Sequence, residues 1–289
     1  MSGDDPRPGG QPPGRLLNAL RRGRDKWADL WPRMLSGVVL AVLGLALLLA
    51  SGLWVRLGVS AVIGLMMWEL ARLTGWRHPE FHSPRHPVLI AVLAGLVMLA
   101  MLVLPGDWPM ALAAVPMVAG WPGTHEHERP AYLMFTLAIL GAGYGLVVIR
   151  EVMGLPTLAW IVGTVVLSDL LGYFVGRRLG GPRFWPAISP RKTWSGTVAG
   201  WLGALLLALL LVLAGQAPWP VLLLGPLVAL AGQFGDIAES WLKRRVGVKD
   251  SSGLIPGHGG ALDRFDAMAG ALLLALLLLI VNFLPVIGG

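Results

Sequence analysis

Apolar residues recur along this chain in nine runs, separated by charged or by glycine- and proline-containing stretches. Roughly 20 apolar helical residues are needed to cross a bilayer, and most of the runs approach that length. We therefore expect an all-α, polytopic integral membrane protein with about nine transmembrane helices. The run at 109–121 is the shortest, and a re-entrant segment is the alternative there. The predicted spans are 34–50, 53–73, 88–104, 109–121, 132–150, 155–175, 196–215, 219–238 and 268–287.

The composition agrees with this pattern and excludes a soluble globular protein. Mean hydropathy is +0.69, and 55% of the 289 residues are hydrophobic against 13% charged. Residues 1–14 are rich in proline and glycine, which predicts disorder. Residues 15–33 mix basic and apolar side chains, as in an interfacial amphipathic helix, so 1–33 is a basic N-terminal arm. The remainder divides into membrane regions 34–150 and 151–289, and the second carries the polar motifs.

The distribution of basic residues predicts the topology. If the amino terminus is cytoplasmic, only Arg56 and Arg150 of the 23 Lys and Arg residues fall on the outer side. This asymmetry follows the positive-inside rule and favours an odd number of crossings. The net charge of +7 then reflects topology and anionic lipid headgroups, and no nucleic acid partner is expected. The chain has no cysteine, which excludes disulfides and Cys-based metal sites.

Acidic residues gather at the predicted inner ends of the spans, where charge is costly and therefore informative. A helix would place Asp236 and Glu239, three apart, on one face, and Asp263 and Asp266 repeat that spacing. Two helices can thus direct four carboxylates at one volume, with Asp169 nearby. Such carboxylates repel one another unless a cation balances them, and Mg²⁺ prefers oxygen ligands of this kind. The sequence therefore predicts a magnesium site.

Basic residues lie next to these acids along the chain. Mixed carboxylates and cations suit phosphoryl or nucleotidyl transfer, in which acids hold a metal and cations neutralise the leaving group. A solvated loop that only sets topology is the alternative. Glycines around His258, and the segment SPRKT at 189–193, are further candidates for phosphate contact, although each pattern is common by itself. The basic residues are Lys243, Arg244, Arg245, Lys249 and Arg264, with Arg177, Arg178, Arg183, Arg191 and Lys192 from the loop 176–195.

Two weaker patterns carry structural expectations. Glu69 and Arg72 are three apart near the end of a span and are expected to pair locally. Gly141, Gly143 and Gly145 are expected to allow close helix packing.

Together these residues resemble the phosphatidate cytidylyltransferase (CDP-diacylglycerol synthase) family. The resemblance runs from Ser240 through Lys243-Arg244, Lys249-Asp250 and His258-Gly259-Gly260 to Asp263-Arg264-Phe265-Asp266. The segments SDLLGYFVGRRLG at 168–180, SPRKTWSG at 189–196 and GDIAES at 235–240 are similar to further blocks of that family. Departures from the family pattern at Gly172, Ser195, Ala261 and Ala267 remove no acid or lysine that the mechanism requires, although Ser195 stands where the family often has Glu or Gln.

The resemblance implies an enzyme that condenses CTP with phosphatidic acid in the bilayer and releases pyrophosphate. It also implies Mg²⁺, K⁺ as a second cation, and a homodimer. We assign catalytic roles to Lys192, Asp236, Asp263 and Asp266, and metal binding to Asp236, Asp263 and Glu239. The predicted substrate-binding residues are Ser189, Thr193, Lys243, Arg244, Lys249, His258 and Arg264.

Three other functions stay open at this stage. A CTP-using lipid kinase would transfer the γ-phosphoryl group instead. A CDP-alcohol phosphotransferase requires a D-x-x-D-G-x-x-A-R pattern, which this sequence lacks. A transporter would place its charges near the bilayer midplane, between repeated halves. We expect a bacterial inner membrane, with the active site facing the cytoplasm.

Overall fold

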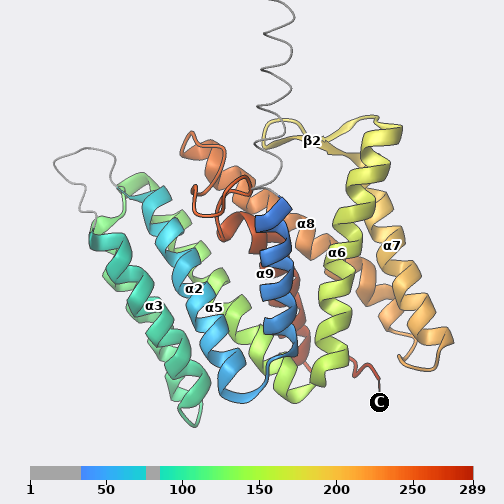
Figure 1. Cartoon of the computed structure of the whole chain (residues 1–289), viewed down its shortest axis with the longest axis horizontal. Helices are drawn as coiled ribbons and strands as arrows, with labels where there is room; N and C mark the ends of the chain where they lie inside the picture. Colours follow the sequence, from blue (N-terminus) through green and yellow to red (C-terminus); the bar gives the residue numbers. More distant parts are fainter. Residues whose placement is uncertain (1–33, 76–84, 289) are drawn as a thin grey trace, which may run out of the picture.

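A computed structural model describes residues 34–75 and 85–288, and most of these residues lie in helices. The predicted basic arm at 1–33 lies outside the described residues. The helices pack side by side into a bundle, with a small β-hairpin at one end (Figure 1). The long helices are Met34–Leu49, α2 (Gly52–Thr74), α3 (Arg85–Val103), α5 (Arg129–Val152), α6 (Gly154–Leu179), α7 (Trp194–Leu213), α8 (Val221–Arg245) and α9 (Leu262–Ile280).

Six helices of the described part, α2, α3 and α5 to α8, are long and apolar enough to cross a membrane. The prediction of an all-α polytopic membrane protein is therefore confirmed. Helix α9 has 19 residues but is not one of these six, because Asp263, Arg264 and Asp266 place charge in its first two turns. The helix Met34–Leu49 is apolar and shorter.

The run predicted to span at 109–121 does not form one α-helix. It consists of a 3₁₀-helix (Trp108–Ala113), α4 (Ala114–Gly120) and a second 3₁₀-helix (Trp121–Gly123). Prolines recur through it, and each removes a backbone donor and crowds the preceding turn, which breaks a regular helix.

This broken segment still carries the chain from one end of the bundle to the other. Helices α2 and α3 run antiparallel, so Val103 lies at the end where α2 begins (Figure 1). Thr124 forms a β-bridge with Gly75, directly after the last residue of α2. The segment 104–124 therefore brings the chain back to the end of the bundle at which α3 begins.

The hairpin consists of β1 (Arg183–Trp185) and β2 (Ser189–Thr193), paired antiparallel. It was not predicted. Thr193 ends β2 and caps α7, because its hydroxyl accepts a hydrogen bond from the backbone N–H of Gly196. The SPRKT segment is thereby fixed against the start of a transmembrane helix.

The two ends of the bundle differ in polarity. One end, here called the polar end, carries the hairpin and the loop 246–261, and Arg245 of α8 binds Glu128 there at 2.8 Å. At the opposite end, Arg56 and Glu151 form an ion pair, also at 2.8 Å. Predicted inner and outer residues are thus separated along the axis of the bundle.

Glycines bring the backbones of α8 and α9 into contact. A Cβ atom added to Gly235 would fall on the backbone oxygen of Asp266, and one added to Gly270 on the backbone oxygen of Ala231. Small residues of this kind let membrane helices approach closely. The contact sets the distance between the acidic residues of the two helices.

The expected close packing at Gly141, Gly143 and Gly145 is confirmed. A Cβ atom at Gly143 would lie 2.7 Å from the side chain of Ile63, and one at Gly145 would lie 3.1 Å from Leu276. These glycines allow α5 to pack against α2 and α9.

We predict that Gly235→Ala destabilises the bundle, because the new methyl group meets rigid backbone. Overpacking of this kind costs about 1–3 kcal/mol, so the midpoint of thermal unfolding in detergent should fall. The matched control is Gly44→Ala, where a Cβ atom meets nothing within 4 Å. Equal midpoints for the two variants would contradict the prediction.

Candidate active site

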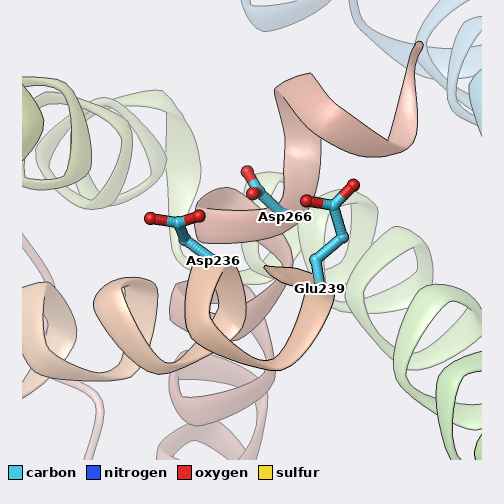
Figure 2. A group of neighbouring side chains, drawn as sticks. All are labelled: Asp236, Glu239 and Asp266. Carbon is cyan, nitrogen blue, oxygen red and sulfur yellow. The ribbon is translucent and has the colours of Figure 1, made fainter. Parts of the chain in front are cut away.

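Three carboxylates converge at the polar end of the bundle (Figure 2). Asp236 and Glu239 project from α8, and Asp266 projects from α9 toward them. Their ligand oxygens all lie within 4.8 Å of one another. The helical spacing on α8 and the glycine contact with α9 together produce this cluster. It contains three of the four acids predicted to converge, and the predicted metal ligand Asp263 lies outside it, where it contacts Lys243.

Glu239 is the most buried member, with its side chain only 1% exposed. Its Oε2 lies 2.5 Å from Nζ of Lys243, whereas Oε1 accepts no hydrogen bond from any residue in the described ranges. A buried carboxylate oxygen without a partner is costly. An orphaned oxygen beside two further carboxylates fits a hard divalent cation, which binds oxygen ligands.

Lys243 neutralises carboxylates from both helices. Its Nζ lies 2.5 Å from Glu239 of α8 and 2.6 Å from Oδ1 of Asp263 of α9. The lysine side chain is 13% exposed, so these contacts are largely shielded from water. The residue predicted to contact substrate is thus placed as a counter-ion between two acids.

Asp263 is held by protein donors on both oxygens. Its Oδ2 accepts hydrogen bonds from the N–H and hydroxyl of Ser251, at 2.9 and 2.8 Å, and from the N–H of Gly260 at 2.8 Å. Burial would raise the pKa of Asp263, but the hydrogen bonds from Lys243 and Gly260 outweigh it and hold the pKa below its usual range. Asp263 is therefore ionised and fixed in place.

A cavity of about 740 Å³ opens beside these acids. Small-molecule sites typically measure about 300–1,000 Å³, so a nucleotide fits. Lys192 of the hairpin enters the cavity and pairs with Asp236. The charged lining residues are Asp169, Asp236, Asp263 and Asp266, with Arg177, Arg183, Arg191 and Lys192.

The structure brings together part of the predicted site. Lys192, Thr193, Asp236, Asp263 and Asp266 line the cavity, and Glu239 and Lys243 contact these residues. The other predicted substrate-binding residues are not among its lining, and their roles stay predictions. These residues are Ser189, Arg244, Lys249, His258 and Arg264.

His258 and Lys249 are two predicted substrate-binding residues that lie away from the cavity lining. His258 is held through Nδ1, which lies 2.8 Å from the hydroxyl of Ser36 in the first described helix. Lys249 is exposed on the loop beyond α8.

The predicted pair of Glu69 with Arg72 is wrong. The Arg72 guanidinium lies 4.7 Å from the ring centroid of Trp68, and no ion pair joins it to Glu69. Glu69 is fully buried and accepts hydrogen bonds from the segment 251–262 instead. The available signal was a carboxylate inside an apolar run, which marks a functional position in membrane proteins.

A polytopic helical bundle with acids and bases around a nucleotide-sized cavity at one end has the features of a membrane-embedded nucleotidyltransferase. The chain belongs to the cytidylyltransferase family, whose sequence model matches residues 31–282. A phosphatidate cytidylyltransferase of Brucella abortus is 34% identical over 84% of this chain and 91% of its own length. Proteins of the same name from Bacillus subtilis and Pseudomonas aeruginosa are 31% and 32% identical, each over 83% of this chain and 93% of its own length.

We predict that Lys243→Met strongly destabilises the protein, since it leaves Glu239 and Asp263 buried without their shared counter-ion. Removing one partner of a buried pair costs about 3–5 kcal/mol. Thermal unfolding in detergent should show a much lower midpoint than for Lys249→Met, which removes an exposed lysine. Similar midpoints for the two variants would be inconsistent with a buried ion-pair network.

Proposed function

We propose that this chain condenses CTP with phosphatidic acid to give CDP-diacylglycerol and pyrophosphate. The observation that carries the proposal is the cavity at the polar end, where carboxylates and basic side chains face one nucleotide-sized space. Transfer to a phosphate ester needs both, because the substrates are polyanions and the leaving group gains charge. The name shared by the three relatives supports the choice of CTP and phosphatidic acid.

In the proposed reaction, an oxygen of the lipid phosphate attacks the α-phosphorus of CTP in line. A new P–O bond forms, the bond from the α-phosphorus to the bridging oxygen breaks, and pyrophosphate leaves with that electron pair. The phosphomonoester is already anionic near neutral pH, so no strong protein base is needed. Lys192 and Arg191 on the hairpin wall orient the triphosphate and neutralise the departing pyrophosphate.

Asp236, Glu239 and Asp266 would hold Mg²⁺, and Asp263 keeps the metal-binding role implied by the family resemblance. The all-carboxylate donor set and the orphaned oxygen of Glu239 fit such an ion. When bound, Mg²⁺ supplies charge neutralisation and polarisation of phosphate oxygens. K⁺ as a second cation and assembly as a homodimer belong to the same proposal and stay predictions.

The polar end faces the cytoplasm of a bacterial cell in this proposal, and the bundle lies in the inner membrane. Support comes from the basic residues, since Arg56 and Arg150 lie toward the end opposite the hairpin. A site at this level meets CTP from the cytosol and the lipid phosphate at the headgroups.

The proposed function is tested by measuring the mass of the lipid product. Purified protein is incubated with labelled CTP, phosphatidic acid and Mg²⁺, and we expect a lipid that has gained CMP together with released pyrophosphate. Release of CDP with a phosphorylated lipid would indicate a kinase. Movement of lipid across a vesicle membrane without nucleotide consumption would indicate a transporter, and either result contradicts the proposal.

We predict that Asp236→Asn and Glu239→Gln each raise the Mg²⁺ concentration needed for half-maximal rate and lower kcat by about 100-fold or more. The reason is the loss of a charged oxygen ligand from the cluster. Asp107→Asn, an exposed substitution in the segment after α3, is the control and should match the wild type. Wild-type Mg²⁺ dependence in Glu239→Gln would exclude Glu239 as a ligand, and comparing Asp263→Asn with Asp266→Asn tests the metal role of Asp263.

A further inference from the structure

Glu69 of α2 is a fully buried carboxylate whose hydrogen-bond partners within the described residues belong to the segment 251–262. Its Oε1 accepts from the hydroxyl of Ser252 at 2.5 Å and the N–H of Ala261 at 3.0 Å. Its Oε2 accepts from the N–H of Leu262 at 2.6 Å and lies 3.2 Å from the hydroxyl of Ser251. One side chain thus holds Ser251 and Ser252 together with Ala261 and Leu262.

The backbone contacts explain why a carboxylate suits this position. The N–H groups at the start of a helix have no partner within the helix, and a negative charge there is favoured by the helix dipole. Ala261 is the N-cap residue of α9 and Leu262 is its first residue, so Glu69 caps that helix from a different helix. Among the described residues, no lysine or arginine forms an ion pair with Glu69.

Glu69 is linked to the active site through groups that also hold Asp263. The hydroxyl of Ser251 lies between the two carboxylates, 3.2 Å from Glu69 and 2.8 Å from Asp263. Gly260, whose N–H donates to Asp263, directly precedes the two residues capped by Glu69. Asp263 in turn contacts Lys243, which contacts Glu239 of the carboxylate cluster. The contacts therefore run without a break from α2 to the cluster.

The geometry does not suit a direct role in the reaction. Glu69 has no exposed surface and is not among the residues that line the cavity. All its acceptor positions face the loop and the start of α9. A Cβ atom on Gly260 would collide with the Glu69 carboxylate and with Ser251, so the loop passes directly over Glu69.

We propose that Glu69 is a positioning residue for cytidylyl transfer, which sets the orientation of Asp263 and, through Lys243, of the carboxylate cluster. The inference rests on the proposed function. It gives the N-terminal half of the chain a defined part in a site whose charged residues all lie in the C-terminal half.

The test compares Glu69→Gln with two serine variants that form a matched pair. Glutamine keeps one acceptor oxygen, but its NH₂ group cannot accept, so the N–H of either Ala261 or Leu262 loses its partner. Ser251→Ala removes the hydroxyl that lies near both Glu69 and Asp263, whereas Ser252→Ala removes a hydroxyl that donates to Glu69 alone. Each purified variant is assayed for kcat, for KM of CTP, and for binding of Mn²⁺ as a probe of the metal site by electron paramagnetic resonance.

We expect kcat to fall about 10- to 100-fold in Glu69→Gln, as when catalytic groups are misplaced by about 1 Å. Mn²⁺ binding should weaken, while KM for CTP should stay near the wild-type value because the hairpin wall is untouched. Ser251→Ala should reproduce these changes and add little to Glu69→Gln in the double variant. Ser252→Ala should be milder.

Several outcomes would overturn the inference. Wild-type kcat and Mn²⁺ affinity in Glu69→Gln would do so, as would equal effects of the two serine variants. If Glu69→Gln does not fold, the serine pair alone decides. Equal effects of Ser251→Ala and Ser252→Ala on kcat and Mn²⁺ binding then count against a role of Glu69. A wild-type protein that makes no cytidylyl-lipid overturns the proposed function instead, and Mn²⁺ binding then still tests whether Glu69 orders the cluster.

Discussion

The site depends on the ion pairs that a single ammonium group, that of Lys243, forms with acids of two helices. Glu239 and Asp263 belong to α8 and α9, and Lys243 lies within 2.6 Å of both. Without it, the glycine contact at Gly235 would force like charges together in a medium that screens them poorly. The apolar packing of α8 on α9 therefore depends on the ion pairs at their ends, and the acids meet only because the two helices pack closely.

The same contacts explain the charge of the site. The four acids Asp236, Glu239, Asp263 and Asp266 have two ammonium groups in direct contact, those of Lys192 and Lys243. Counted over these six side chains alone, without Asp169 and the three arginines that also line the cavity, the formal excess is two negative charges, which one divalent cation would balance. An apolar protein can hold such an excess only where ions and substrate reach it from water, and the end of the bundle meets that condition.

Much of this arrangement follows from local patterns in the sequence. Apolar runs predict the long helices, and spacings of three residues correctly place Asp236 with Glu239 on one helix. The failures have physical causes. Glu69 pairs with groups more than 180 residues away, which spacing cannot reveal. The span near 109–121 is broken by its prolines, and the hairpin is too short to show a strand pattern.

The hairpin has a consequence for how ligands reach the cavity. An isolated two-stranded ribbon is marginally stable in water, whereas transmembrane helices are rigid because their backbone bonds are internal. Lys192 therefore stands on a short ribbon, tied to α7 at Thr193, in an enclosure otherwise built of packed helices. We expect displacement of this ribbon to cost less than separation of two packed helices, which makes the hairpin side the expected route for a water-soluble reactant. A lipid reactant of the proposed reaction would instead arrive within the plane of the bilayer.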